Sequence, residues 1–321
     1  MIIECAPMQG VTDYIFRRVQ SGHFTPADKY YTPFVATTQN HVFTPKMLKE
    51  LSPEINAGIS VVPQLIGHDA EDFLWAAREL KALGYREVNF NLGCPSGTVV
   101  GKKKGAGLLS EKDMLRAMLD EIFEKSPIGI SVKTRIGRQS PEEFAAILEL
   151  YNDYPMTELI IHPRLQKQQY EGTPHMNAWE IAVQSSKNLL CYNGDIFDRT
   201  CAEAFAAKYP QIGRIMLGRG LAANPKLVGE MRGEAPVTKE ELRAYHDDTF
   251  AACREKMPQD KPLLLHLKEF WYYFSRCFAD SDKALKQLRK AQTASDYLSA
   301  VDTLFAHCSV KDVAGFEPYG V

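Results

Sequence analysis

The first 232 residues of this chain alternate, about eight times, between a short apolar run and a longer segment with helical periodicity. The runs show little polar–apolar alternation, which is typical of parallel strands covered by helices. The expected strands are residues 2–6, 29–35, 61–66, 87–91, 128–133, 158–161, 189–192 and 214–217. Eight strand–helix units favour a (β/α)8 TIM barrel. A doubly wound parallel sheet is the alternative.

Helix-start signals lie between these strands. Ser110 opens the sequence Ser-Glu-Lys-Asp, a capping pattern, and apolar side chains follow at helical spacing as far as Phe123. Pro141 opens a second helix, whose apolar face includes Phe144 and Tyr151. The sequence therefore predicts helices after residues 110 and 141.

The pattern changes after Pro236, where strand candidates end. The following segments read as helices: residues 239–256, 262–278, 282–291 and 294–307. We therefore expect a TIM-barrel domain over residues 1–234 and a small all-helical domain over residues 235–321.

Composition excludes several classes of protein. No apolar run approaches the roughly 18 residues of a membrane helix, and a strand at the N-terminus leaves no room for a signal peptide. The seven cysteines show no CxxC pair and no regular spacing, so neither a disulfide framework nor a zinc site is expected. We expect a cytoplasmic monomer without metal or membrane contact. A net charge of −2 means that any nucleic-acid binding must come from local clusters.

A cysteine stands directly after the expected strand 87–91, in the sequence Asn-Leu-Gly-Cys-Pro. Cys94 lies between a glycine and a proline, on a turn with a fixed exit at the strand end where barrel enzymes do chemistry. Its thiol is placed to deliver or take a proton. Other strand ends carry a matching set of groups: Pro7, Met8, Gln9, Gln64, Asn91, Lys133, Arg135, His162, Asn193, Gly194, Asp195, Gly218 and Arg219.

The last two strand ends predict a phosphate site. In barrels the loops after strands seven and eight often bind phosphate, and glycines let backbone N–H groups approach it. Asn193-Gly194-Asp195 and Gly218-Arg219 fit that use, with Arg219 adding charge. The alternative is that both sequences are ordinary tight turns.

Two further strand ends fit the ring of a bound flavin. The Gln64 amide can pair with the donor and acceptor edge of the pyrimidine portion, and a lysine at position 133 can stabilise the anion of reduced flavin. His162 can hydrogen-bond the flavin or a phosphate. The alternatives are a surface lysine that extends into water and a structural histidine.

Two groups of lysines are candidates for RNA contacts. Lys102, Lys103 and Lys104 lie in a glycine-rich segment that we expect to be a flexible loop able to meet an anionic polymer, unless they form only a solvated charge run. In the helical domain, basic and aromatic residues interleave: Lys268, Trp271, Tyr272, Arg276, Lys283, Lys286, Arg289 and Lys290. This domain has 12 Lys and Arg against 13 Asp and Glu, so it is not basic overall, and Trp271 can equally be core.

Five motifs together resemble those of the tRNA-dihydrouridine synthases. They are Ala6-Pro7-Met8 with Gly10-Val11-Thr12-Asp13, Asn91-Leu92-Gly93-Cys94-Pro95, Val132-Lys133-Thr134-Arg135, Asn193-Gly194-Asp195-Ile196, and Met216-Leu217-Gly218-Arg219-Gly220. The resemblance implies an FMN-binding barrel and a helical RNA-binding domain. It implies FMN contacts from Pro7, Met8, Gln64, Lys133, His162, Asn193, Asp195, Gly218 and Arg219, to which we add Gln9 and Gly194.

The resemblance also implies a reaction. NADPH visits transiently to reduce FMN, hydride then passes to C6 of a uracil in tRNA, and Cys94 as general acid gives a proton to C5. The base must leave its stack for this. Arg135 would lie near the target uridine, with Asn91 on the same RNA side. One departure is Pro163-Arg164-Leu165, where many members have Gly-Arg-Thr after the histidine.

Two other functions fit parts of the pattern. One is a flavin barrel that acts on a small pyrimidine, as dihydroorotate dehydrogenases do, although such an enzyme would not need the helical domain. The other is a non-catalytic RNA-binding protein that keeps the barrel as a scaffold. The motifs leave three questions open: which uridine is reduced, whether the RNA substrate is tRNA or rRNA, and whether the reductant is NADPH or NADH.

Overall fold

The computed structural model describes residues 1–316, and their contacts divide the chain into two compact units. The first unit consists of Met1–Pro7, Asp28–Asp195 and Tyr209–Met216. The second consists of Met8–Ala27, Ile196–Lys208 and the chain from Leu217 onward. The expected domain boundary at residue 234 falls inside the second unit and stays a prediction.

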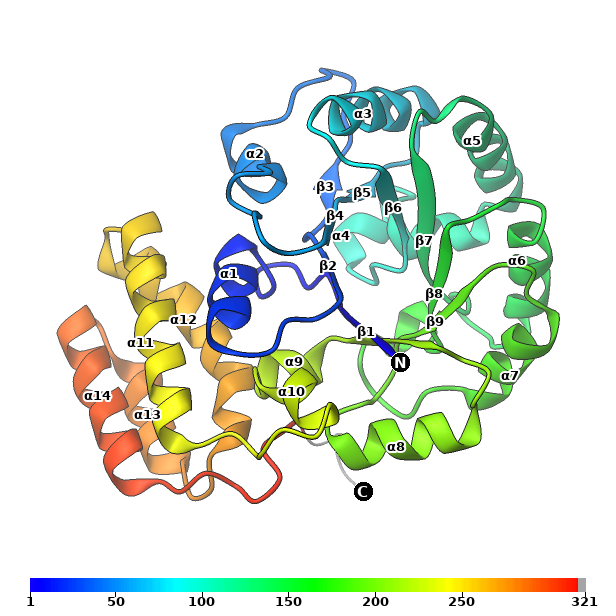
Figure 1. Cartoon of the computed structure of the whole chain (residues 1–321). Coiled ribbons are helices and arrows are strands. Elements are labelled where there is room, and N and C mark those ends of the chain that lie inside the picture. The colour runs from blue at the N-terminus through cyan, green and yellow to red at the C-terminus, as the bar shows by residue number, and fades with distance from the viewer. Residues whose placement is uncertain (317–321) are drawn as a thin grey trace. The chain divides into compact units, whose positions relative to one another are not determined.

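The first unit is built on a parallel sheet (Figure 1). Its strands are β1 (Ile2–Cys5), β2 (Lys29–Tyr31), β3 (Val35–Ala36), β4 (Val61–Val62), β5 (Gln64–Ile66), β6 (Glu87–Leu92), β7 (Gly129–Arg135), β8 (Glu158–His162), β9 (Leu190–Tyr192) and β10 (Arg214–Leu217). The hydrogen-bonded order is β3-β5-β6-β7-β8-β9-β10-β1-β2-β4, with parallel ladders.

Two prolines explain why eight expected strands appear as ten. Pro33 lies between β2 and β3, and Pro63 lies between β4 and β5. Proline lacks the N–H that a ladder needs, so each proline interrupts a strand without ending its path. The single strand expected over residues 29–35 is therefore two pieces. Because β4 and β5 are also one path, the two ends of the strand order meet, and the predicted parallel α/β barrel is confirmed.

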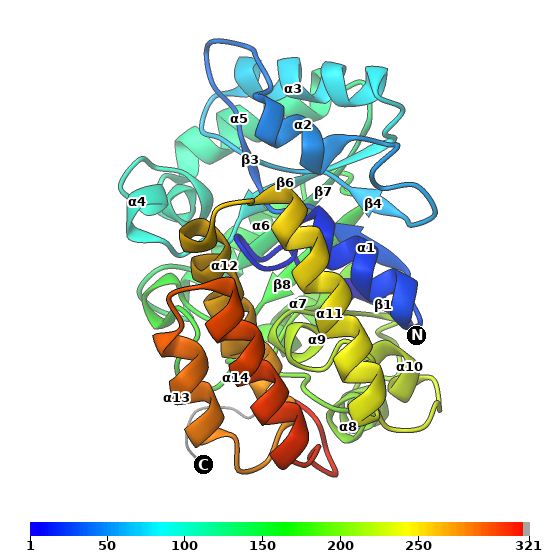
Figure 2. The same cartoon turned by 90° about the vertical axis from the view of Figure 1, so that its left-hand side faces the viewer.

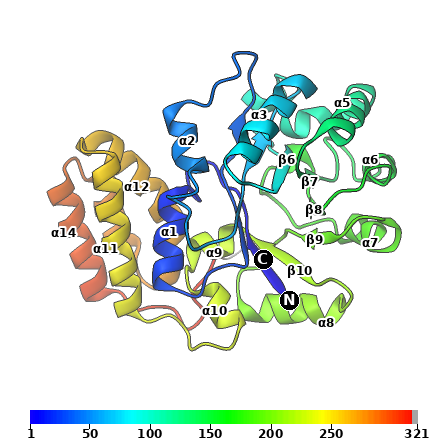
Figure 3. The same cartoon turned by 45° about the horizontal axis from the view of Figure 1, so that its top comes forward.

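Helices cover the outside of these strands, as Figure 3 shows for α3, α5, α6 and α7. The helical elements of the first unit are α2 (Pro45–Leu51), α3 (Ala70–Ala82), α4 (Gly97–Val100), η1 (Gly105–Ser110), α5 (Lys112–Lys125), α6 (Glu143–Tyr151), η2 (Gln166–Gln168) and α7 (Met176–Ser185). The η elements are single 3₁₀ turns or short 3₁₀ runs.

Two helix starts differ from the capping signals in the sequence. Ser110 does not cap α5, because it ends η1 and donates its hydroxyl to the Gly107 carbonyl at 3.2 Å. The expected start at Pro141 shifts to Glu143, whose carboxylate accepts the backbone N–H groups of residues 138–140 at 2.7–2.9 Å. Because this carboxylate accepts three backbone hydrogen bonds, it holds the β7–α6 loop against the start of the helix.

The second unit contains the remaining helices. They are α1 (Tyr14–His23), α8 (Arg199–Lys208), α9 (Arg219–Ala223), α10 (Leu227–Met231), α11 (Lys239–Lys256), α12 (Asp260–Phe274), η3 (Ser275–Cys277), α13 (Asp282–Lys290) and α14 (Ala294–His307). Their apolar faces share one core, in which Tyr245, Leu267, Trp271 and Leu304 are buried. The predicted C-terminal helices are confirmed as α11–α14. Among residues 1–316, no helix has the length and apolar character needed to cross a membrane.

Candidate active site

The turn that carries Cys94 is held from two sides. The Asn91 side-chain oxygen accepts the backbone N–H groups of Gly93 at 3.1 Å and Cys94 at 2.9 Å. Arg135, at the end of β7, donates its Nε to the Gly93 carbonyl at 2.9 Å and another N–H to the Leu165 carbonyl at 2.9 Å. These bonds hold the backbone of the turn, so Cys94 lies at the carboxyl end of β6.

The segment after Cys94 is not the flexible loop that we expected. It forms α4 and η1, and Gly105 to Leu109 are buried. The Ala106 N–H donates to the Cys94 carbonyl at 3.1 Å. Gly105 has φ +55°, and a Cβ there would lie 3.0 Å from the Cys94 Cβ. Glycine is needed at this position because the turn packs directly against the cysteine.

The environment of Cys94 favours a protonated thiol. The side chain is half-buried, and burial raises its pKa, opposed by a backbone hydrogen bond from Ser96 and the charges of Arg135 and Lys133. A thiol of raised pKa is a proton donor at neutral pH, whereas a nucleophilic cysteine needs a depressed pKa. All seven cysteines are free, and Cys94 and Cys201 are the two that are not fully buried.

A row of amides lies beside this turn inside the barrel. Asn91 Nδ2 donates to Gln64 Oε1 at 2.7 Å, Gln64 Nε2 donates to Asn89 Oδ1 at 2.7 Å, and Asn89 Nδ2 donates to Ser131 Oγ at 3.0 Å. The residues adjoin across β5, β6 and β7 in the ladder register. The network fixes the orientation of the Gln64 amide, which is fully buried, and leaves one of its N–H groups and one oxygen lone pair unused within residues 1–316.

The side chain of Lys133 is a potential binding group for an anionic ligand. Its register partner across the ladder is Asn91, and among residues 1–316 its ammonium makes no hydrogen bond or ion pair. Burial, together with the nearby Arg135 charge, lowers its pKa to about 7. Because an uncompensated buried ammonium is unfavourable, a group with negative charge bound here would stabilise it.

His162 is held by Arg164, which the sequence analysis noted only as part of a departure from the family's motif. Arg164 is buried and donates to His162 Nε2 at 3.1 Å and to Asp195 Oδ1 at 2.7 Å. Asp195, expected to contact a cofactor, is thus the ion-pair partner of Arg164. Nearby, Asn193 Nδ2 donates to the Met216 carbonyl at 2.8 Å, which sets the turn after β9.

Tyr170 is a second residue that sequence reasoning missed. Its ring is 45% exposed, stands 5.5 Å from the Arg135 guanidinium and lies 6.3 Å from the His162 ring. It follows η2, in a loop with no motif that would single it out. Arg135 itself is buried under this ring, so its expected contact with RNA stays a prediction.

Four of the expected cofactor residues belong to the second unit. Met8 is buried, and its N–H donates to Thr12 Oγ1 at 2.8 Å, which closes a turn, while Gln9 is exposed. Arg219 lies over the rings of Phe197 and Phe316, at 5.2 and 5.1 Å. It follows Gly218, the N-cap of α9. Pro7, half-buried, is the last residue of the first unit's N-terminal stretch.

The lysine candidates for RNA differ in their surroundings. Lys103 pairs with Glu111 at 3.0 Å, Lys104 is half-buried and points to the Thr37 carbonyl at 3.4 Å, and Lys102 is exposed without an ion pair within residues 1–316. On α13, Lys283, Lys286 and Lys290 are all exposed. Trp271 is 4% exposed, so the core interpretation holds for its ring.

A buried charge cluster lies elsewhere in the barrel. Glu4, Glu158 and Cys191 place potential metal-ligand atoms within 4.8 Å of one another. Lys29 lies 3.2 Å from Glu158 and 3.8 Å from Glu4, and Arg214 lies 3.5 Å from Glu4, so cationic side chains already balance these carboxylates. Burial and then the charge of Glu158 raise the pKa of Glu4 to about 8.

Solved structures share the barrel. The chain is similar to a morphinone reductase mutant in complex with tetrahydroNAD (TM-score 0.52, 13% identity, 72% of this chain and 86% of that one). It is also similar to an old yellow enzyme homologue from Zymomonas mobilis (TM-score 0.52, 13% identity, 76% and 92%). At this identity the likeness shows the fold alone.

Sequence comparison identifies the family. The model of the dihydrouridine synthase family matches residues 4–306, and the chain belongs to that family of oxidoreductases. A probable tRNA-dihydrouridine synthase of Staphylococcus aureus is 30% identical over 232 residues, 68% of each chain. One from Staphylococcus epidermidis is 28% identical over 322 aligned positions, covering 95% of this chain and 94% of the relative. Membership of the family implies a flavin cofactor.

Proposed function

We propose that this enzyme reduces a uridine of tRNA to 5,6-dihydrouridine, with FMN as the flavin and NADPH as the transient reductant. The observation that carries the proposal is the Cys94 turn, which Asn91 and Arg135 hold at the carboxyl end of β6, with Lys133 as the ladder neighbour of Asn91. The relatives named above as probable tRNA-dihydrouridine synthases support tRNA as the substrate.

The residues of the first unit fit a flavin. Lys133 offers a cation without a partner among residues 1–316, Gln64 offers an oriented amide, and His162, which Arg164 holds in place, is a further proposed contact. A cation near the pyrimidine portion and an amide on its edge are the means by which a protein tunes such a cofactor. Pro7, Asn193 and Gly194 are further proposed flavin contacts of the first unit. Met8, Gln9, Gly218 and Arg219 are proposed flavin contacts that belong to the second unit.

When bound and reduced, the flavin supplies the hydride that adds to C6 of the uracil ring. Cys94 then gives its Sγ proton to C5, and the thiolate regains a proton from water. Asn91 and Arg135 hold the turn so that the thiol keeps one position during this transfer. General acid catalysis requires such a positioned donor, and it contributes about 10²–10⁴-fold.

A flavin enzyme for a small pyrimidine is the weaker candidate. It would have no use for the exposed lysines on α13, which suit a polyanion. We propose, with the tRNA function, that the chain acts as a monomer in the cytoplasm, and that α11–α14 form the RNA-binding part.

Mapping of dihydrouridine tests the proposal. RNA from cells that lack the gene should lose dihydrouridine at defined positions in tRNA, detected by mass spectrometry. Purified protein with FMN and NADPH should restore it. Loss confined to ribosomal RNA, or no loss, would contradict the tRNA assignment. Purified protein without bound or acquired flavin would instead support a non-catalytic RNA-binding role.

A further inference from the structure

A cavity of about 170 Å³ opens among the C-terminal helices of the second unit. Figure 2 shows α12, α13 and α14 packed beside one another. Trp271 and Tyr297, both buried, lie at the cavity's base, and Leu285 and Leu288 of α13 also line it. Three more lining residues are less buried: Lys268, Tyr272 and Arg289.

The polar atoms of the aromatic base are satisfied among themselves. Trp271 Nε1 donates to Tyr297 Oη at 2.7 Å, and Tyr297 Oη lies 2.7 Å from His246 Nε2. His246 Nδ1 lies 2.8 Å from Asp247 Oδ1. The tyrosine hydroxyl accepts from the indole, which can only donate. Because the Asp247 carboxylate accepts the Nδ1 proton of His246, Nε2 of the neutral ring accepts from the tyrosine hydroxyl. The base therefore needs no polar ligand and presents ring carbons to the cavity.

The cations around this cavity have no anionic partners within residues 1–316. The side-chain cations of Lys268 and Arg289 make no ion pair or hydrogen bond there. The same holds for the ammonium groups of the three exposed lysines of α13, Lys283, Lys286 and Lys290. Other cations of the same unit are paired: Arg243 with Asp247 and Asp302, Arg254 with Asp260, and Lys226 with Glu241. A run of unpaired cations beside one helix is complementary to an extended polyanion.

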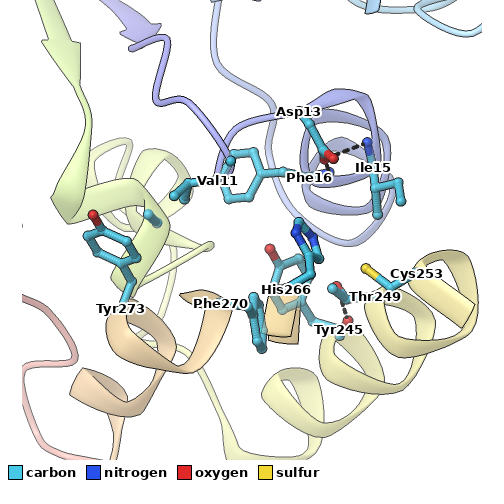
Figure 4. Close-up of a pocket in the computed structure, with 12 residues that line it drawn as sticks. Val11, Asp13, Ile15, Phe16, Tyr245, Thr249, Cys253, His266, Phe270 and Tyr273 are labelled. Carbon is cyan, nitrogen blue, oxygen red and sulfur yellow. Dashed lines mark hydrogen bonds between the residues drawn. The ribbon is translucent and has the colours of Figure 1, made fainter. Parts of the chain in front are cut away.

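The cavity has the size of a single ring. An apolar cavity of roughly 150 Å³ holds a benzene molecule, so about 170 Å³ accommodates one six-membered nucleobase ring. By contrast, the pocket in Figure 4, lined by Asp13, Thr249 and His266 among others, offers only about 20 Å³. That space suits one water molecule.

We propose that the cavity among α12, α13 and α14 receives one unstacked nucleobase of the tRNA, with the flanking phosphates on Lys268 and Arg289. This inference rests on the proposed function for its choice of RNA. Stacking on aromatic side chains with cations along the backbone is how proteins hold single-stranded bases. The lining of the cavity contains no residue of the turn that carries Cys94, and the anchored base is one other than the target uridine.

Tyr272→Ala tests the stacking contact, and Lys286→Gln is the matched control. Tyr272 is 42% exposed but its ring packs against Tyr273 and lies near the Arg276 guanidinium, so the melting temperature of the variant must verify folding. Lys286 lies on α13 outside the cavity lining. Tyr272→Ala should weaken tRNA binding about 5- to 100-fold with an unchanged salt slope. Lys286→Gln should reduce the log–log salt slope by about 0.7–0.9.

A second variant and a base-level measurement complete the test. Leu285→Phe fills the cavity from its wall, and it should weaken tRNA binding like Tyr272→Ala while its melting temperature verifies folding. Chemical probing of the bound tRNA should show one base that is protected by the wild type and reactive with Tyr272→Ala. Wild-type affinity and protection in both variants would overturn the proposal.

The turnover of these variants separates this proposal from the proposed function. At saturating tRNA, the Tyr272→Ala enzyme should keep kcat for dihydrouridine formation while KM rises. If the wild type forms no dihydrouridine, the proposed function fails, yet the binding and probing measurements still decide whether a base occupies the cavity.

Discussion

Arg164 donates a hydrogen bond to Nε2 of His162 at 3.1 Å, and this contact fixes the protonation of the imidazole. A guanidinium has only donors, so Nε2 must accept, and the neutral ring carries its proton on Nδ1. The second partner of Arg164, Asp195, anchors the guanidinium in place. His162 is therefore held as the tautomer that carries its proton on Nδ1.

Replacing Arg164 by methionine should release this constraint. We expect the wild-type ring to carry its proton on Nδ1, because a proton on Nε2 would face the guanidinium. In Arg164→Met both neutral tautomers should be populated. The ¹⁵N chemical shifts of the imidazole, assigned with His162→Gln, distinguish the two tautomers, and identical shifts in the two proteins would refute the tautomer assignment.

Cys94→Ala should abolish one half-reaction and spare the rest. FMN binding, NADPH oxidation and tRNA binding should persist, while single-turnover oxidation of prereduced enzyme by tRNA falls about 10²–10⁴-fold. Because burial raises the pKa of the Cys94 thiol, the wild-type rate should stay level through neutral pH and fall only in alkaline solution, as the proton is lost. Equal single-turnover rates in the two enzymes would remove Cys94 from the mechanism.

The affinity for FMN should depend on the charge of Lys133. Its pKa of about 7 means that the ammonium is charged below pH 7 and increasingly neutral above it. FMN affinity should therefore fall as pH rises through 7, measured by quenching of flavin fluorescence. Lys133→Met should bind weakly with no such dependence, and Lys133→Arg should keep its affinity at pH 8.5. If the Lys133→Met protein binds FMN as tightly as the wild type at pH 6, the charge of Lys133 does not contribute to FMN affinity.

Glu4 should make the protein less stable as pH rises. Its pKa is about 8 in the folded state against 4.5 as the ordinary value, so the folded state binds more protons between these pH values. The free energy of unfolding should fall across that range, by at most about 1.4 kcal/mol per pH unit. Urea unfolding at pH 5, 6, 7 and 8 measures this slope. Glu4→Gln, which mimics the protonated acid, should lose it, and an equal slope in both proteins would exclude Glu4 as its source.

Lys102 and Lys103 form a matched pair for the salt dependence of tRNA binding. Lys102 has no ion pair within residues 1–316, whereas Lys103 pairs with Glu111. Lys102→Gln should reduce the log–log salt slope by about 0.7–0.9 if it contacts a phosphate. Lys103→Gln should change the slope less, since Glu111 already competes for its charge. Unchanged slopes in both would identify this segment as an ordinary solvated surface.

The fold was predictable because its signals are local. The boundaries of α11 and α14 match the expected 239–256 and 294–307, and each helix begins with a capping box, from Thr238 to Glu241 and from Thr293 to Asp296. Continuous apolar runs likewise placed the strands. The prediction that Ser110 caps a helix was wrong, because its hydroxyl donates to the Gly107 carbonyl within a 3₁₀ turn.

The site was predictable only as a set of strand ends. Cys94, Asn91, Gln64 and Lys133 follow from position in parallel strands, whose carboxyl ends meet. The partnership of Arg164 with Asp195, 31 residues apart, depends on β8 and β9 lying side by side. A charged side chain such as Arg135 is ordinarily expected to be exposed. Arg135 is buried instead, and its guanidinium donates to the backbone carbonyls of Gly93 and Leu165.

The hydrogen bonds from Trp271 through Tyr297 to His246 join α12, α14 and α11 in one directed chain. The Asp247 carboxylate accepts the Nδ1 proton of His246, so Nε2 accepts from Tyr297, and burial lowers the pKa of His246 so that the ring stays neutral. Breaking either bond removes a hydrogen-bond partner from buried polar groups on the two helices that it joins, and α14 takes part in both bonds. Amide hydrogen exchange in α11, α12 and α14 should therefore proceed by one cooperative opening, with the three helices behaving as a single foldon.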